Sequence, residues 1–260
     1  MHVVYIYLWV GLLGLAVGSF LNVVIYRLPR QIKIGLSRSF CPSCRTPIPF
    51  YDNIPLLSYV LLGGKCRCCK AVIPARYPAV ELLSALIFAF FFYNFGLTTQ
   101  FFVYAFVAAL LLSIIFIDVE FQLIPDYLTI PGMIIGLAVS LAPSGIGIVS
   151  SVIGLLVGGG ALYIIALLGD WLFKKDSMGG GDIKMAAMLG AFLGWEKVIF
   201  IFFAAAVIGL LASIIIMALS KKVRKTRIIP FGPFLALAAY VAILYGDNLI
   251  DLYINHFWRV

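Results

Sequence analysis

The chain has 260 residues, of which 63% are hydrophobic and only 12% are charged. With a mean hydropathy of +1.11, this composition excludes an ordinary soluble domain and predicts a polytopic membrane protein. The formal net charge of +8 does not indicate nucleic-acid binding, because basic residues gathered on the cytoplasmic side, in contact with anionic lipid, account for it.

Eight apolar segments follow one another along the chain. Most are long enough, or nearly long enough, to cross about 30 Å of hydrocarbon as helices, and one is short. We therefore predict an all-α polytopic protein with about eight transmembrane segments, at residues 4–26, 79–97, 101–118, 127–142, 145–169, 183–194, 197–219 and 229–246.

The long loop after the first segment sets the orientation. Residues 27–78 contain nine Lys or Arg and a single acid, Asp52, so the positive-inside rule places this loop in the cytoplasm and the N-terminus outside. Alternation of the later spans puts the basic segment 220–228 inside as well. The predicted domains are a first transmembrane helix (1–26), a cytoplasmic domain (27–78) and a transmembrane domain (79–260).

All five cysteines fall in the cytoplasmic loop, as Cys41-Pro-Ser-Cys44 and Cys66-Arg-Cys68-Cys69. Two C-x-x-C pairs at this separation come close to the spacing of four-thiolate zinc sites, and the reducing cytosol disfavours disulfides. We predict a zinc-binding domain with the ligands Cys41, Cys44, Cys66 and Cys69. Cys68 could replace one of the last two ligands only by changing the spacing of that pair.

Two aspartates, Asp118 and Asp182, stand where a long apolar run meets a short polar loop, and the predicted topology puts both loops on the cytoplasmic face. Ionisable side chains at membrane depth are costly and therefore indicate a functional site. Two carboxylates that can meet suggest aspartyl-protease chemistry, in which one is protonated and the other ionised. Helix position favours Asp182 as the anion, because it starts a segment, and Asp118 as the neutral acid, because it ends one.

Glycines precede the second aspartate in Gly179-Gly-Gly181-Asp182. Glycine permits positive φ and lets another backbone pass closely. We expect Gly179 and Gly181 to serve both purposes, and the alternative is a flexible turn into a short helix.

With the four cysteines, the two aspartates and the Gly179–Asp182 motif in this order, the chain resembles the bacterial type IV prepilin peptidases. The matching stretches follow the family's order over most of the chain: Gly18 to Pro29, the four-cysteine module, Asp52 to Pro55, Arg76 to Pro78 with Glu81, Asp118 to Asp126, and Gly179 to Asp182. The extra Cys68 is a departure from the family pattern, and it bears on the thiol ligands rather than on the aspartates.

The resemblance implies a G-x-G-D intramembrane aspartyl protease with Asp118 and Asp182 as the catalytic pair. It also implies a second activity, N-methylation of the new amino terminus with S-adenosylmethionine as methyl donor. The implied substrates are prepilins or pseudopilins of pilus or secretion systems, and the implied location is the bacterial cytoplasmic membrane.

Other acids near the pair have ordinary explanations. Asp126 follows Pro125 at the start of a span and is expected to cap that helix. Glu120 and Asp176 are expected to be solvated, with attraction of a basic leader peptide as the alternative. We nevertheless keep Glu120 and Asp126 as supporting residues of the site.

The methyl-donor site is harder to find, because the sequence has no glycine-rich nucleotide motif of the Rossmann kind. Gly64, Arg76 and Glu81 are the candidates. Glu81 lies just inside an apolar segment, which is costly unless Arg76 or another cation pairs with it. A structural ion pair is an equally good explanation of these two residues.

Two other function classes remain open. A proton-coupled transporter also holds intramembrane carboxylates, but a transporter's acids typically lie near the bilayer midplane between repeated halves. Asp118 and Asp182 are instead predicted to lie at the cytoplasmic edge. A membrane scaffold that displays a zinc knuckle is the other alternative, and it gives no reason for the Gly179–Asp182 motif.

Overall fold

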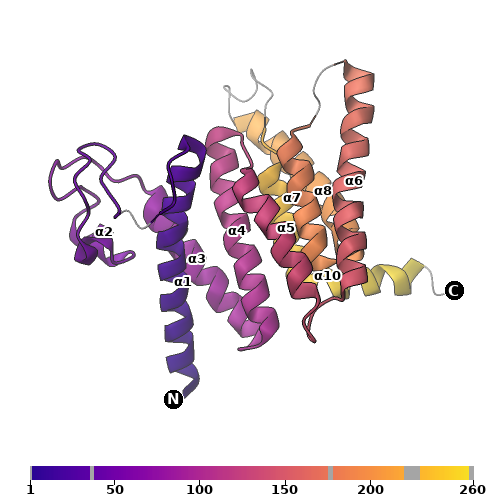
Figure 1. The fold of residues 1–260 in the computed structure, drawn as a ribbon, viewed down its shortest axis with the longest axis horizontal. Helices are drawn as coiled ribbons and strands as arrows, with labels where there is room; N and C mark the ends of the chain where they lie inside the picture. Colours follow the sequence, from indigo (N-terminus) through magenta and orange to yellow (C-terminus); the bar gives the residue numbers. More distant parts are fainter. Residues whose placement is uncertain (1, 36–37, 175–177, 220–228, 258–260) are drawn as a thin grey trace. The chain divides into compact units, whose positions relative to one another are not determined.

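The computed structural model describes residues 2–35, 38–174, 178–219 and 229–257. Within these ranges the regular secondary structure is helical apart from two isolated β-bridges, which confirms the predicted all-α class. The acid Asp176 and the basic segment 220–228 lie outside the described residues. Figure 1 shows the helices, which are α1 (His2–Arg27), α2 (Leu57–Leu61), α3 (Arg76–Phe95), α4 (Thr99–Phe121), α5 (Asp126–Ser140), α6 (Ile148–Phe173), α7 (Gly180–Leu193), α8 (Trp195–Leu219) and α10 (Gly232–Phe257), with short 3-10 turns at Leu28–Arg30 and Phe50–Asn53.

Each of the eight apolar segments forms a helix, but not every helix is long enough to cross a bilayer. Among the described residues, six helices have the length and composition of a membrane span, namely α1, α3, α4, α6, α8 and α10. The other two, α5 and α7, have only 15 and 14 residues, or about 22 and 21 Å of helix. These six candidate spans among the described residues point to a multi-pass membrane protein, and the predicted count of about eight is not confirmed.

The chain divides into two compact units, Met1–Ser113 and Ile114–Val260. The division falls inside α4, so the first unit holds α1, the cysteine loop, α3 and the first part of α4. Because this division follows packing, it groups the first helix and the cysteine loop with α3, whereas the sequence-based boundaries separate them.

In the first unit, α1 and α3 approach each other through glycines. A Cβ atom on Gly14 would lie 2.7 Å from the Cα of Ala85, and one on Gly18 would lie 2.7 Å from the Cα of Glu81. Small residues at such positions let two helix backbones come close within a membrane. The pair is fixed further by a 2.9 Å hydrogen bond from Asn22 Nδ2 to the backbone carbonyl of Tyr77.

In the second unit, α7 packs against α6 by direct backbone contact. A Cβ on Gly190 would overlap the carbonyl oxygen of Gly154, and a Cβ on Gly158 would overlap that of Ala186. Ser151 Oγ adds a 2.6 Å hydrogen bond to the carbonyl of Ala191. Every residue from 185 to 193 is buried, so α7 is an internal helix enclosed by protein, as an all-round apolar helix is expected to be.

Gly190→Ala should destabilise the fold, because the new methyl group has no room between α6 and α7. Overpacking of this kind costs about 1–3 kcal/mol or more. Thermal unfolding of the purified protein in detergent should show a lower midpoint. Gly160→Ala is the matched control, since a Cβ at Gly160 on α6 meets nothing within 4 Å; an equal loss in both variants would contradict the packing argument.

Candidate active site

Asp118 lies in the last turn of α4, which continues to Phe121, beyond the predicted end of this span. The preceding side chains Ile114 and Ile117 are fully buried, and Asp118 itself is only 6% exposed. Its carboxylate accepts a hydrogen bond from the backbone N–H of Gly232, the first residue of α10. A carboxylate withdrawn from water needs such a donor.

Asp182 lies in the first turn of α7, and its backbone N–H donates to the carbonyl of Gly179 at 3.1 Å. Asp118 is close enough to interact electrostatically with Asp182, so the two predicted acids come together. Asp182 Oδ1 is buried and has no hydrogen-bond partner among the described residues. The site thus contains two carboxylates that interact electrostatically, one with a backbone donor and one with a buried oxygen left to accept or share a proton.

Ile124 lies against the starts of both α7 and α10. A Cβ on Gly181 would lie 2.8 Å from the Cβ of Ile124, and a Cβ on Gly232 would lie 3.1 Å from its Cδ1. The expected positive φ of the glycines is wrong: Gly179 has φ of −69°, and Gly181 is not among the positive-φ residues. Gly181 is needed because the Ile124 side chain occupies the place of its missing Cβ.

Of the two supporting acids, Asp126 differs from its predicted role and Glu120 does not. Asp126 is the first residue of α5 and makes no side-chain cap, so the capping hypothesis is wrong. Its carboxylate instead binds Lys184 Nζ of α7 at 2.7 Å, because the two helices begin at the same end of the unit. Glu120 is exposed at the end of α4.

Gly232 is the site residue that the sequence did not reveal. The run Pro230-Phe-Gly232-Pro233 marks a helix start, because proline favours the first turn of a helix. Nothing in that run says that the helix would begin against Asp118, since the contact joins segments far apart in the sequence.

The four predicted metal ligands form a cluster in the first unit. The Sγ atoms of Cys41, Cys44, Cys66 and Cys69 all lie within 4.8 Å of one another, and those of Cys41 and Cys69 are 3.8 Å apart. Four thiolates around a tetrahedral zinc ion, at about 2.3 Å each, are separated by roughly 3.8 Å. The cluster could therefore hold a metal ion of this kind.

The two cysteine pairs sit in equivalent turns. In the first, Cys41 N–H donates to Thr46 and Arg45 has φ of 57°. In the second, Cys66 N–H donates to Ala71, and Lys70, the residue equivalent to Arg45, has φ of 58°. This register pairs Cys66 with Cys41 and Cys69 with Cys44, and it leaves the exposed Cys68 outside the set.

Thr46 also affects the thiols chemically. Hydrogen bonds from its side chain and backbone lower the pKa of Cys44 to about 6, which favours the thiolate that a metal ion requires. Its hydroxyl also lies 3.7 Å from the Sγ of Cys68.

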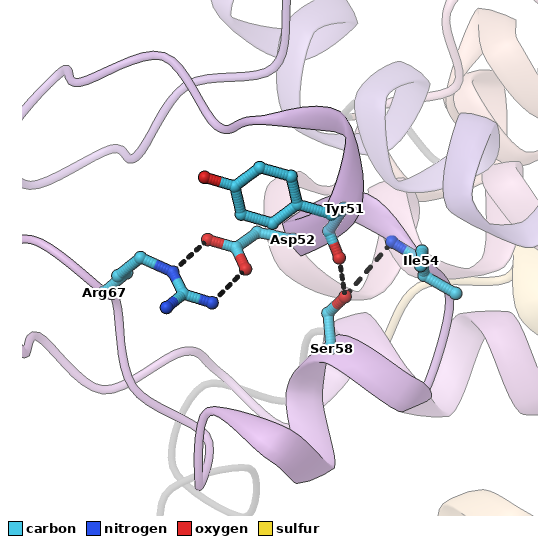
Figure 2. Close-up of polar contacts among 5 residues, drawn as sticks. All are labelled: Tyr51, Asp52, Ile54, Ser58 and Arg67. Atoms are coloured by element: carbon cyan, nitrogen blue, oxygen red, sulfur yellow. Dashed lines mark hydrogen bonds and ion pairs between the residues drawn. The ribbon is translucent and has the colours of Figure 1, made fainter.

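The second cysteine turn is joined to the preceding loop by an ion pair. Figure 2 shows the guanidinium of Arg67 facing the carboxylate of Asp52, with contacts of 2.7 Å from Nε and 2.6 Å from Nη2. This two-point hydrogen bond lowers the pKa of Asp52. In the same loop, Ser58 Oγ donates to the carbonyl of Tyr51 at 2.9 Å and accepts from the N–H of Ile54 at 3.2 Å.

The loop braced in this way presents a backbone donor to Glu81. Leu56 has φ of 59°, and the N–H of Leu57 bonds to the carbonyl of Pro55 at 2.6 Å, which forms a γ-turn of the rare, strained kind. The N–H of Leu56 donates to Glu81 Oε2 at 2.9 Å. Glu81 is 9% exposed and also receives a hydrogen bond from the hydroxyl of Ser19.

Further polar side chains are buried on the same two helices as Glu81. Asn22 on α1 and Ser84 on α3 are 3% and 2% exposed. Asn22 Oδ1 and Ser84 Oγ have no hydrogen-bond partner among the described residues. Buried polar atoms are normally satisfied, so each exception needs an explanation.

The two remaining methyl-donor candidates are Gly64, in the cysteine loop, and Arg76, at the start of α3. Gly64 has φ of +67°, and a Cβ there would lie 3.2 Å from the ring of Tyr59. Arg76 begins α3, with its Cζ 5.2 Å from the centre of the Tyr77 ring. The hydrogen bonds to Glu81 described above come from Leu56 and Ser19, so the Arg76–Glu81 pair remains a prediction.

Comparisons with known proteins bear on both units. The sequence profile of the bacterial peptidase A24 N-terminal domain matches residues 12–95, and that of the type IV leader peptidase family matches residues 105–214. No solved structure matches the chain significantly.

Curated relatives match almost end to end. The prepilin leader peptidase/N-methyltransferase of Pseudomonas aeruginosa is 36% identical, over 94% of this chain and 92% of its own length. The proteins of the same name from Legionella pneumophila and Neisseria gonorrhoeae are each 35% identical, over 97% and 92% of this chain and 96% and 90% of their own lengths. The resemblance noted in the sequence is thereby confirmed, and the chain belongs to the type IV leader peptidase family.

Proposed function

We propose that this chain is a bifunctional prepilin-processing enzyme, which cleaves the leader peptide of type IV prepilins or pseudopilins and N-methylates the new N-terminal residue. Family membership and the names of the relatives support both activities. The observation that carries the proteolytic half is the adjacency of Asp118 and Asp182, with a buried, unpartnered oxygen on Asp182.

Hydrolysis by this pair follows from what two adjacent carboxyl groups can do. The ionised member takes a proton from water as the water oxygen attacks the scissile carbonyl carbon, and the neutral member donates its proton to the carbonyl oxygen. When the resulting tetrahedral centre breaks down, the C–N bond opens and the leaving amine takes up a proton. Two negative charges this close would repel each other strongly, so one shared proton is the stable arrangement.

We place the methyl-transfer step in the first unit, around Glu81. The carboxylate is held by two donors, and Asn22 Oδ1 and Ser84 Oγ are buried without partners on the same two helices. Strained turns such as the one at Leu56 occur at functional sites, where the surrounding structure maintains them. A carboxylate so placed can bind the new amino terminus and accept a proton from it, and S-adenosylmethionine supplies the methyl group. Gly64 and Arg76 are the further candidates for contacts to the methyl donor.

For the cysteine cluster we propose structural zinc. The four sulfur atoms lie within 4.8 Å of one another, and one pair is at the 3.8 Å separation of a tetrahedral zinc site; the loop between α1 and α3 also has little apolar core of its own. Bound zinc would hold the two cysteine turns together, and through Arg67 and Asp52 it would fix the loop that reaches Glu81.

The proposed location is the bacterial cytoplasmic membrane, with the N-terminus outside and the active site facing the cytoplasm. The basic loop 27–78 supports this orientation, and it would contact anionic lipids. Prepilins or pseudopilins are the proposed partners, and no role requires nucleic acid.

Asp118→Asn and Asp182→Asn should each abolish leader cleavage, by at least about a hundredfold, because an amide cannot shuttle the proton. Methylation of an already cleaved pilin should survive in both variants, since it is assigned to the other unit. Purified protein incubated with a prepilin, with and without S-adenosylmethionine, gives the answer by product mass. Glu196→Gln, at an exposed acid on α8 that is assigned no role in the site, is the control, and near-normal cleavage by either asparagine variant would contradict the catalytic pair.

Cys41→Ser, Cys44→Ser, Cys66→Ser and Cys69→Ser should each release the bound zinc, whereas Cys68→Ser should retain it. Elemental analysis of the purified variants measures this directly. Metal loss in Cys68→Ser, together with retention in Cys66→Ser or Cys69→Ser, would show that the ligand set is different.

Glu81→Gln should lower methylation by at least about tenfold while cleavage continues, because the amide keeps the size of the side chain but cannot accept the proton. The ratio of methylated to unmethylated mature pilin measures the effect by mass. Glu196→Gln, an exposed acid on α8, is the control. Unchanged methylation in Glu81→Gln would leave Glu81 with only a structural role.

A further inference from the structure

The first residue of α10, Gly232, has a backbone N–H group that no carbonyl of the helix accepts. The N–H groups of Phe234 and Leu235 both donate to the carbonyl of Phe231, and Pro233 has no N–H. The N–H of Gly232 is therefore left for an acceptor outside the helix, as the first donors of a helix generally are. That acceptor is the carboxylate of Asp118.

No other residue type fits at this position without displacing the acid. A Cβ atom on Gly232 would lie 2.6 Å from Asp118 Oδ2, 3.3 Å from its Cγ and 3.1 Å from Ile124 Cδ1. The backbone of α10 thus touches the Asp118 carboxylate directly, and the helix start adds its partial positive charge.

Asp182 is placed differently, although it also lies at a helix start. Its Oδ1 is buried without a hydrogen-bond partner among the described residues. A Cβ on Gly179 would lie 3.4 Å from Asp182 Oδ2, an ordinary contact. A neutral carboxylic acid is the less costly form when one carboxyl oxygen is buried without a donor, because an ionised oxygen in that position is disfavoured.

We propose that Gly232 is a positioning residue, which holds Asp118 as the ionised base of the catalytic pair and so leaves the shared proton on Asp182. This inference rests on the proposed proteolytic function, and it reverses the assignment that helix position in the sequence suggested. In the reaction, Asp118 takes the proton from water and Asp182 donates its own proton to the scissile carbonyl oxygen.

Gly232→Ala tests the positioning role by kinetics. Displacing Asp118 from its donor should lower kcat for leader cleavage roughly ten- to a hundredfold, the effect expected when a charged group loses a hydrogen bond, with KM changed less than about twofold. Gly246→Ala is the control on the same helix, because a Cβ there meets only the side-chain methylenes of Lys197 at 3.6 Å. An unchanged kcat in folded Gly232→Ala, or a loss confined to KM, overturns the role.

Infrared spectroscopy tests the proton assignment directly, first with Gly232 unchanged and then with Gly232→Ala. With ¹³C-labelled aspartate at neutral pH, and with the Asp118→Asn/Asp182→Asn double variant subtracted, Asp118→Asn should show a neutral carboxylic acid band and Asp182→Asn should not. Adding Gly232→Ala to Asp182→Asn should make the band appear, because Asp118 loses its donor. A band in Asp182→Asn alone, or its absence in Asp118→Asn, overturns the assignment.

These outcomes separate the inference from the proposed function. If both single asparagine variants cleave normally, the catalytic pair itself is wrong. If both are inactive while the band belongs to Asp118, the pair stands and only the role of Gly232 falls.

Discussion

Buried carboxylates that depend on backbone donors are the constraint around which both units are built. Asp118 and Glu81 are each withdrawn from water by apolar helices, and each accepts from a backbone N–H of a distant segment. In both cases the local backbone conformation leaves the N–H available. Gly232 is the first residue of a helix and precedes a proline, and Leu56 lies in a strained turn. Because each donor belongs to the main chain, these two contacts tolerate little change in backbone position.

The cysteine loop extends this constraint within the first unit. Arg67 stands between two cysteines and binds Asp52, and the residues after Asp52 form the turn that reaches Glu81. A thiolate cluster can thus influence a carboxylate at the membrane edge through one ion pair and one short loop. The cysteine module and the Asp52 to Pro55 stretch are therefore parts of one structural unit.

The sequence predicted what depends on local pattern. Hydrophobic runs marked all eight apolar helices, and cysteine spacing selected the four thiols that cluster, because periodicity and spacing are local properties. Prediction from the sequence was wrong or incomplete where a contact joins segments that are distant in the chain. The Asp126 carboxylate binds Lys184 and caps nothing, and Gly181 makes room for Ile124 without adopting positive φ. The hydrogen bond from Gly232 to Asp118 could not be predicted from sequence either, because the start of α10 meets the end of α4 only in the folded unit.

The shortness of α5 and α7 has a consequence for the helices around them. Both helices begin at the end of the unit that holds the acids, as the Asp126–Lys184 pair shows, and they stay together as far as Gly136 and Ala191. At about 22 and 21 Å, they are roughly 8 Å shorter than the hydrocarbon layer. Neither helix can therefore reach both surfaces of that layer at once. The end that stops short must be enclosed by the longer helices around it, which agrees with the burial of every residue from 185 to 193 of α7.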